Sequence, residues 1–383
     1  MPLALPFSIN RTYRIAVSVF FFIAGFVFAS WASRIPDIKN HLHLSDAGLG
    51  SILLALPAGL MTGLPLAGYL VSRYGSKKIM ITAAFLYPGI LLLLGFADTT
   101  WQLTSALFMF GFCGNLLNIS INTQAVGVEA IYGRSIMASF HGLWSVAGFT
   151  GAALSTLMIA YTLTPFQHFC IICATAFLLI FAAYKHVLPL DSGNTKQPIF
   201  DKPDNAILKL GMIAIGSLVC EGTMFDWSGV YFEKVLKVPD ALRTVGFIAF
   251  MSSMAFGRFV ADWLVTKFGV KRMLQISAII ISSGLLTAVI FPYIVPATIG
   301  FLLVGLGVSS VVPITYGLAG KSTTMSPGAA LAALSTVGFL GFLLGPPLIG
   351  FIAQTAGLRW SFTVIAIIGF TTTILATKIK IQN

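Results

Sequence analysis

The chain contains one basic stretch twice, first as Gly68-Tyr-Leu-Val-Ser-Arg-Tyr-Gly-Ser-Lys-Lys78 and then as Asp262-Trp-Leu-Val-Thr-Lys-Phe-Gly-Val-Lys-Arg272. The copies are 194 residues apart in a chain of 383. The same offset relates Asp46 to Asp240 and Gly63 to Gly257. A constant offset over this distance indicates that one half of the chain duplicates the other. Each copy lies between long apolar segments, so we expect a short basic loop between two membrane helices.

The composition excludes an ordinary soluble domain. Hydrophobic residues make up 57% of the chain, charged residues only 9%, and the mean hydropathy is +0.92. Soluble domains carry about 25% charged residues. Such a chain must place most of its surface in lipid, where helices satisfy their own backbone hydrogen bonds. The net charge of +11 is explained by basic cytoplasmic loops, so no nucleic-acid partner is expected.

Twelve stretches reach the length of about 20 apolar residues that a membrane-spanning helix needs. The first half contains 13–33, 47–71, 79–97, 101–127, 136–160 and 165–185. The second half contains 208–232, 243–266, 273–291, 296–319, 328–353 and 361–378. The fold class is therefore predicted to be an all-α membrane protein of twelve helices in two pseudo-symmetric six-helix halves. The predicted halves are 1–185 and 207–383, joined by a polar, turn-rich linker at 186–206.

The distribution of Lys and Arg predicts the orientation. With the N-terminus inside, sixteen basic residues lie on the inner side and six on the outer side, and Arg258 lies within a span. Cytoplasmic loops are the ones enriched in Lys and Arg. Both termini and the linker are therefore predicted to be cytoplasmic.

The repeated loop and the twelve spans resemble the major facilitator superfamily. That family's signature runs Gly-x-x-x-Asp-Arg-x-Gly-Arg-Lys, and Gly68, Arg73, Gly75 and Lys77 match it. Ser72 takes the acidic position and Ser76 the second basic one. The resemblance implies alternating access around a central site. It also implies a gating function for this loop, and we expect Ser72 to weaken the inner lock because it supplies no charge.

A narrower resemblance comes from Asn115 to Glu129 and from Glu221-Gly-Thr-Met-Phe-Asp-Trp-Ser228. These segments are similar to the fucose-permease-like branch and its uncharacterised bacterial inner-membrane relatives. Drug exporters of the superfamily carry a Gly-Pro pair in the fifth span, whereas Gly148-Phe-Thr-Gly-Ala-Ala153 has no proline. The exporter alternative is therefore weakened.

Acidic residues within membrane spans are rare, so each is a candidate functional residue. Glu221 lies near the middle of the seventh span, and Asp226 lies about one turn further out. A carboxylate removed from water can alternate between charged and neutral forms, which proton coupling requires. The alternative is a structural acid held by a basic or hydroxyl partner.

Arg258 and Asp262 lie at i and i+4 in the eighth span and can share one helix face. A mutual salt bridge is the simpler interpretation, and we favour it. The alternative is a gating function, in which Arg258 exchanges partners with Glu221 or Asp226 during transport.

The fourth span carries Asn115, Asn118 and Asn122 on one helix face, with Glu129 further along the same stripe. Side-chain amides both donate and accept hydrogen bonds, which suits solutes that bear hydroxyl or amide groups. We interpret the asparagines as a cavity lining and Glu129 as a gating residue at the cytoplasmic end. Hydrogen bonding between helices is the alternative.

Further substrate-binding candidates are aromatic or ionisable residues within or near the spans. Trp144 could stack on a ring, whereas Trp31 near an interface and a lone embedded histidine are more often structural. The full set is Trp31, Arg34, His141, Trp144, Trp227, Tyr231 and Tyr316.

The sequence contains no nucleotide-binding loop, metal-ligand cluster or nucleophile arrangement, so we expect no enzyme activity, no cofactor and no metal. The leading hypothesis is a monomeric secondary transporter of the inner membrane. Its partners would be a small polar organic solute, sugar-like or similar, together with protons and the lipid bilayer. The alternatives are a proton-antiport exporter of amphipathic compounds and a membrane sensor that does not transport.

Overall fold

The computed structural model describes residues 7–133, 136–189, 204–320, 322, 324–325 and 327–377. Twelve helical segments of this part of the chain are long and apolar enough to cross a membrane, which confirms the predicted number of spans. The chain forms two compact units. Unit 1 comprises the described residues of Met1–Arg34 and Ala55–Thr195, and unit 2 those of Ile35–Leu54 and Lys196–Asn383.

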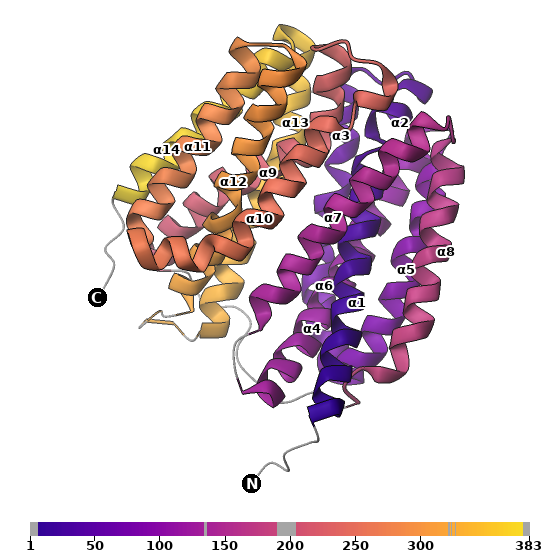
Figure 1. Ribbon diagram of the computed structural model, residues 1–383, viewed down its shortest axis with the longest axis vertical. Coiled ribbons are helices and arrows are strands. Elements are labelled where there is room, and N and C mark those ends of the chain that lie inside the picture. The colour runs from indigo at the N-terminus through magenta and orange to yellow at the C-terminus, as the bar shows by residue number, and fades with distance from the viewer. Residues whose placement is uncertain are drawn as a thin grey trace. The chain divides into compact units, whose positions relative to one another are not determined.

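Unit 1 is drawn in indigo to magenta in Figure 1. Its helices are α1 (Phe7–Ala32), α4 (Ala55–Tyr74), α5 (Ser76–Gly95), α6 (Thr100–Tyr132), α7 (Met137–Ala160) and α8 (Pro165–Ala183), followed by the 3-10 turn η1 (Tyr184–His186). The helix α6 packs against α4 and α5, while α1 packs against α7 and α8.

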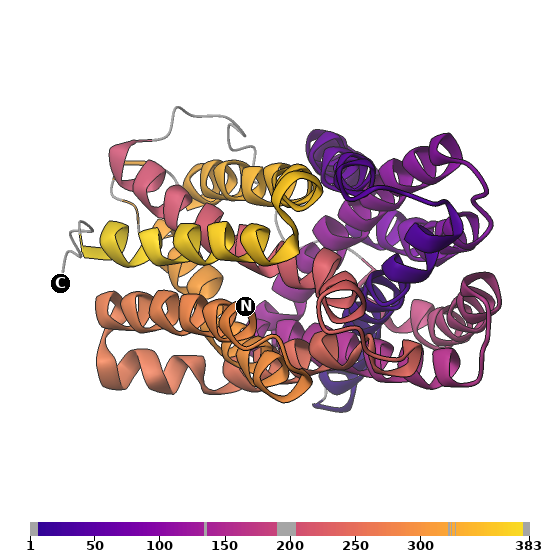
Figure 2. The same cartoon turned by 90° about the horizontal axis from the view of Figure 1, so that it is seen from above.

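Unit 2 contains α2 (Ile35–His41), α3 (Asp46–Leu53), α9 (Asn205–Lys234), the turn η2 (Asp240–Leu242), α10 (Val245–Phe268), α11 (Val270–Ile290), α12 (Ile294–Ala319), α13 (Pro327–Ala356) and α14 (Leu358–Thr377). The helix α9 packs against α12, α13 and α14, and α11 lies beside α12 and α14 (Figures 1 and 2). The helices α2 and α3 pack within unit 2, and the predicted halves 1–185 and 207–383 stay a prediction. Most of the predicted linker lies outside the described residues, so its boundaries stay a prediction.

The second predicted span is not one continuous helix. It consists of α3 and α4, with the interruption at Leu54. Proline has no amide hydrogen, so Pro57 cannot donate to the carbonyl of Leu53 four residues earlier. The loss of this hydrogen bond explains why the helix breaks at this point.

The two copies of the basic loop have the same backbone geometry. Gly75 separates α4 from α5 with φ +85°, and Gly269 separates α10 from α11 with φ +77°. A positive φ is readily adopted only by glycine. The glycine at this position of the repeat is therefore a backbone requirement in both units.

The duplication extends to contacts between helix backbones. A Cβ atom on Gly111 of α6 would overlap the carbonyl oxygen of Leu56 in α4. At the same offset of 194 residues, a Cβ atom on Gly305 of α12 would overlap the carbonyl oxygen of Phe250 in α10. Small residues permit this close approach of helices in lipid. The two units thus share an equivalent glycine contact.

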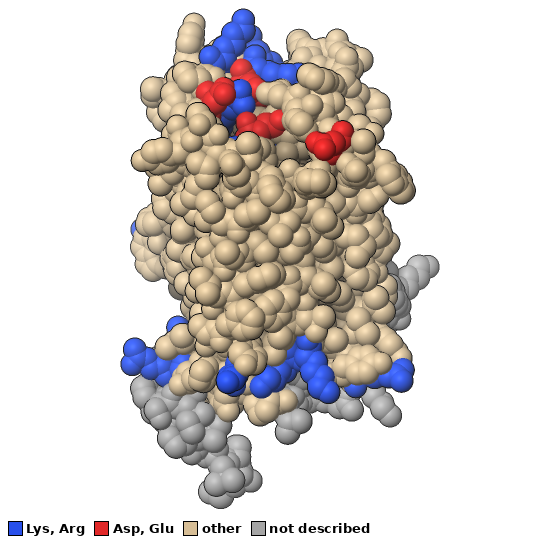
Figure 3. Space-filling model, turned by 90° about the vertical axis from the view of Figure 1, so that its right-hand side faces the viewer, with Lys and Arg blue, Asp and Glu red and all other residues tan. Residues whose placement is uncertain are grey.

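Basic residues gather at one end of unit 1. The start of α5 and the end of α8 lie at one end of the unit, because Gly95 at the other end of α5 contacts Phe166 at the start of α8. Basic residues gather at that end, namely Arg73, Lys77, Lys78 and Lys185. Figure 3 shows charged side chains at both ends of the displayed face and almost none between them. This pattern is typical of a membrane-embedded surface.

The glycine contact can be tested with a matched pair of substitutions. Gly111→Ala should lower the apparent unfolding temperature in detergent, because overpacking costs about 1–3 kcal/mol. Gly89→Ala in α5 is the control, since a Cβ atom there would meet no atom within 4 Å. It should leave the unfolding temperature unchanged or slightly raised, because alanine is the better helix former. Equal effects of the two substitutions would contradict the contact.

Candidate functional site

The central polar feature of unit 2 is an ion pair between Glu221 of α9 and Arg258 of α10. The Nη2 atom of Arg258 lies 3.6 Å from Oε1 of Glu221. The side chain of Arg258 is 18% exposed and that of Glu221 is 7% exposed. This distance is too long for a hydrogen bond. The attraction between these two atoms is therefore electrostatic and lacks the directional restraint of a hydrogen bond.

The ion pair has apolar neighbours along α9. Leu218 and Phe225, one turn to either side of Glu221, are both buried. The ring of Phe225 packs against those of Phe247, Phe250 and Phe342. A charge in such surroundings is costly unless it is paired, so each member of the pair depends on the other.

This contact bears on the predicted salt bridge between Arg258 and Asp262. Arg258 faces Glu221 in this structure, and its exchange of partners during transport stays a prediction. The side chain of Asp262 lies outside the described residues, so the mutual bridge stays a prediction.

The other predicted residues of α9 differ in their surroundings. Asp226 is half-buried, and Trp227 is fully buried with no hydrogen-bond partner for its Nε1 atom among the described residues. The hydroxyl of Tyr231 donates to the carbonyl oxygen of Ala288 at 2.8 Å. Tyr316 of α12 shares a 2.7 Å hydrogen bond with Ser335 of α13. Both tyrosines therefore join helices within unit 2, and their predicted contact with substrate stays a prediction.

In unit 1, the asparagines of α6 are not equivalent. Nδ2 of Asn122 donates to the carbonyl oxygen of Asn118 at 2.8 Å and to its Oδ1 atom at 3.0 Å, so these two side chains share one face. Asn118 is exposed and Asn122 half-buried. Asn115 is buried against Gly63 of α4, and its amide atoms have no hydrogen-bond partner among the described residues. Of the three asparagines, only Asn118 and Asn122 thus keep side-chain surface exposed.

Glu129 has a structural role that the sequence analysis did not foresee. Its Oε2 atom accepts hydrogen bonds from the amides of Ile136 and Met137, at 2.7 and 2.9 Å. The helix α7 begins there without a side-chain cap of its own. A carboxylate at a helix N-terminus satisfies free amides and interacts favourably with the helix dipole. Glu129 therefore joins the end of α6 to the start of α7, and its gating function stays a prediction.

Arg34 is buried at the end of unit 1 opposite the basic loop. Its Nε atom donates to Nδ1 of His168 at 3.2 Å, and an Nη2 atom donates to the carbonyl oxygen of Leu163 at 3.0 Å. Nδ1 of His168 must be unprotonated to accept this bond, which assigns the neutral tautomer that carries its proton on Nε2. The contacts tie the end of α1 to the start of α8. Trp31 is also buried there, with no hydrogen-bond partner for Nε1 among the described residues.

His141 and Trp144 of α7 lie against the aromatic stretch of α1. The exposed ring of His141 meets Phe21 edge-on at 5.3 Å, and the half-buried ring of Trp144 lies 6.1 Å from Phe28. Both rings keep part of their surface accessible to a solute.

Two residues of the predicted gating loop, Ser72 and Arg73, make local contacts. The hydroxyl of Ser72 donates to the carbonyl oxygen of Tyr69 at 2.8 Å, and Arg73 lies over the rings of Tyr69 and Tyr74. Lys77 follows in the first turn of α5, and a Cβ atom on Gly68 would meet nothing within 4 Å. These contacts leave the predicted function of the loop untested.

Gln124 of α6 was missed by the sequence analysis. It is buried and donates to the hydroxyl of Ser76 at 2.7 Å and to the carbonyl oxygen of Leu188 at 3.1 Å. Its Oε1 atom accepts from the amide of Leu188 at 2.9 Å. Ser76 replaces the second basic residue of the signature, so this departure from the pattern was the available signal.

A second missed feature is an ion-pair cluster at the end of unit 2 opposite the Gly269 loop. Asp46 of α3 pairs with Lys39 of α2 at 3.1 Å and with Lys234 of α9 at 2.7 Å. Burial lowers the pKa of Lys39, while Asp46 favours its charged form. Arg243 pairs with Asp37 of α2, Glu233 of α9 and Asp240 of η2. The cluster fastens α2 and α3 to α9.

Comparisons with known sequences agree on one family. A sequence profile of the Major Facilitator Superfamily matches residues 16–324 and 245–380. An uncharacterised MFS-type transporter of Yersinia pestis is 32% identical over 355 residues, which are 93% of this chain and 92% of that protein. The membrane protein MosC of Rhizobium meliloti is 31% identical over 359 residues, which are 92% of this chain and 87% of that one.

Solved structures show the same architecture. A variant of the nucleoside transporter NupG superposes with a TM-score of 0.76 at 12% identity and covers 96% of this chain and 99% of its own. A bacterial homologue of the lysosomal transporter Spinster, in an inward-facing and occupied conformation, has a TM-score of 0.75 at 15% identity and covers 96% and 97%. At these identities the likeness concerns the fold alone.

The dependence of Glu221 and Arg258 on each other can be measured by a double-mutant cycle. Arg258→Gln should lower the free energy of unfolding by about 3–5 kcal/mol, because it leaves a buried carboxylate without its cation. The double variant Glu221→Gln/Arg258→Gln should be less destabilised than the sum of the single variants. Unfolding of the purified protein in mixed micelles provides the measurement. Additive effects would show that the two groups do not interact.

Proposed function

The chain belongs to the major facilitator superfamily of secondary transporters, and from this premise we propose that it moves a small polar organic solute across the inner membrane by alternating access, coupled to protons through Glu221. The family is one of transporters and not of enzymes. The chain is a multi-pass membrane protein with bacterial homologues. Within the superfamily we propose the fucose-permease-like branch, on the strength of the segments Asn115 to Glu129 and Glu221 to Ser228.

One observation carries the coupling proposal, namely the buried 3.6 Å contact between Glu221 and Arg258. Protonation of Glu221 removes its negative charge and with it the electrostatic attraction to Arg258. Loss of this attraction weakens the contact between α9 and α10, which favours a rearrangement of the two helices. Deprotonation restores the original pair. A proton on Glu221 is thereby linked to a change in helix contacts.

The proposed solute is inferred from the accessible side chains of unit 1. The amides of Asn118 and Asn122 both donate and accept hydrogen bonds, and the ring of Trp144 offers a stacking surface. A solute with hydroxyl or amide groups on a ring fits this set. Sugars belong to this class, and so do nucleosides, which the fold relative NupG is described as transporting. A thermal-shift screen of the purified protein with both classes would identify the solute for transport assays.

The orientation is proposed from the basic residues. Both termini and the linker are assigned to the cytoplasm, since cytoplasmic loops are enriched in Lys and Arg. Reporter fusions at the central linker and after Asn383 should therefore both report a cytoplasmic location. An external signal from either fusion would overturn the orientation.

The coupling function of Glu221 can be tested by replacing it with an amide. Glu221→Gln keeps the shape of the side chain and can form hydrogen bonds, but it cannot titrate. In liposomes this variant should retain solute binding and exchange while losing uphill accumulation driven by a proton gradient. Accumulation of radiolabelled solute, compared with counterflow in the same vesicles, separates the two activities.

Asp226→Asn is the matched control, because it removes the second carboxylate of α9. Asp226 is about 7 Å further along the helix at a rise of about 1.5 Å per residue. We expect this variant to weaken solute binding or gating while leaving the remaining transport dependent on pH. If Glu221→Gln still accumulates solute uphill with normal pH dependence, Glu221 is not the coupling residue.

A further inference from the structure

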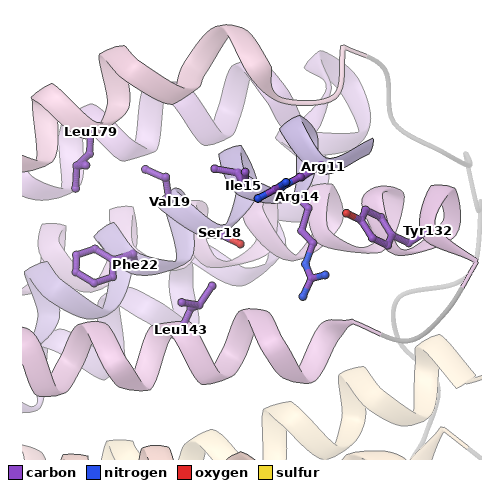
Figure 4. Close-up of a pocket in the computed structure, with 9 residues that line it drawn as sticks. All are labelled: Arg11, Arg14, Ile15, Ser18, Val19, Phe22, Tyr132, Leu143 and Leu179. Carbon is purple, nitrogen blue, oxygen red and sulfur yellow. The ribbon is translucent and has the colours of Figure 1, made fainter. Parts of the chain in front are cut away.

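A groove on unit 1 has a chemistry unlike that of the proposed solute site. It encloses about 610 Å³ and is lined by α1, with one residue each from α6, α7 and α8. Figure 4 shows Arg11, Arg14 and Tyr132 toward one end of the groove, and Phe22 and Leu179 toward the other. The lining residues are Arg11, Arg14, Ile15, Ser18, Val19, Phe22, Tyr132, Leu143 and Leu179.

The charged end of the groove carries only positive side chains. Arg11 is exposed and Arg14 is half-buried. The guanidinium of Arg14 lies over the ring of Tyr132 at 5.4 Å, and an Nη2 atom donates to the hydroxyl of Ser139 at 3.4 Å. These contacts hold Arg14 at the end of the groove, and no acidic residue is among the lining residues to neutralise the pair. This end is therefore complementary to an anion.

The remainder of the groove is apolar, apart from Ser18. Ile15, Val19 and Phe22 follow one another along α1, and Leu143 and Leu179 contribute from α7 and α8. The groove follows α1 from Arg11 to Phe22, which is about 16 Å at 1.5 Å per residue. One leaflet of a bilayer contributes about half of a hydrocarbon core that is about 30 Å thick. The apolar wall, from Ile15 to Phe22, takes up about 10 Å of this length and therefore fits within one leaflet.

We propose that this groove binds an anionic phospholipid, with the headgroup phosphate on Arg11 and Arg14 and an acyl chain along Ile15, Val19 and Phe22. Basic pockets between membrane helices on the cytoplasmic side are suited to anionic headgroups. Guanidinium groups bind phosphate with good geometry, and the apolar wall replaces neighbouring lipid tails. The bound lipid would contact α1, α6, α7 and α8 and so stabilise unit 1. A free anion would use only the arginines and leave the apolar wall uncovered.

The charged end can be tested with purified protein in detergent. Phosphatidylglycerol should raise the unfolding temperature of the wild-type protein more than phosphatidylcholine, which carries no net charge. Arg11→Gln/Arg14→Gln should bind phosphatidylglycerol about 30-fold more weakly in native mass spectrometry. Lys77→Gln/Lys78→Gln is the matched control, because it removes two charges from the α4–α5 loop, outside the groove. This control should bind the lipid as the wild type does.

The apolar wall requires its own variant. Val19→Trp keeps both arginines but fills the groove, and it should reduce binding of phosphatidylglycerol without removing charge. Inorganic phosphate alone should not reproduce the stabilisation by the lipid. The proposal fails if the double arginine variant binds as the wild type does, if both lipids stabilise equally, or if phosphate alone gives the full effect. Because Arg11 is exposed and Arg14 half-buried, the arginine variant should fold and remain informative if Val19→Trp does not.

Discussion

The fold depends on the close approach of helix backbones at Gly111 in unit 1 and at Gly305 in unit 2. In lipid, helices gain little from burying apolar surface against one another, because lipid tails are equally apolar. Van der Waals contact between backbones must supply much of the association instead. These contacts bring α6 against α4 and α12 against α10, and the polar side chains of these helices take their positions from them.

Once helices are this close, the buried polar groups must find partners inside the protein. In unit 1 several do so through hydrogen bonds of 2.7–3.2 Å, as with Gln124 to Ser76 and Arg34 to His168. The pair of Glu221 and Arg258 differs, because its 3.6 Å separation is an ionic contact without a hydrogen bond between those atoms. Such a contact loses its energy as soon as one charge is neutralised. The ion pair of Glu221 and Arg258 is therefore suited to an exchange of partners, whereas the hydrogen bonds of Gln124 and Arg34 hold helices together.

The sequence could predict what depends on local pattern and repetition. The twelve spans and the two basic loops follow from apolar length and the offset of 194 residues, and the superfamily follows from the resemblance of the loop to its signature. Contacts between distant residues did not follow. Gln124 of α6 contacts Leu188, and Asp46 of α3 contacts Lys234. The periodicity of a helix shows which of its faces is buried, but it does not show which other segment packs against that face. Likewise, helical spacing placed Glu129 on a polar stripe, but its capping of α7 depends on where the chain returns after α6.

The two halves of the chain share helix contacts but differ in their charged residues. Gly257 contacts Ser309 in unit 2, and at the same offset Gly63 contacts Asn115 in unit 1. The positions equivalent to Glu221 and Arg258, however, are Val27 and Leu64, which carry no charge. The ion pair therefore belongs to one unit only, while the accessible amides of Asn118 and Asn122 belong to the other. Because Arg258 directly follows Gly257, any movement that accompanies release of the ion pair acts at the residue next to a close helix contact. On the proposed coupling mechanism, a proton on Glu221 would in this way affect the packing of α10 against α12.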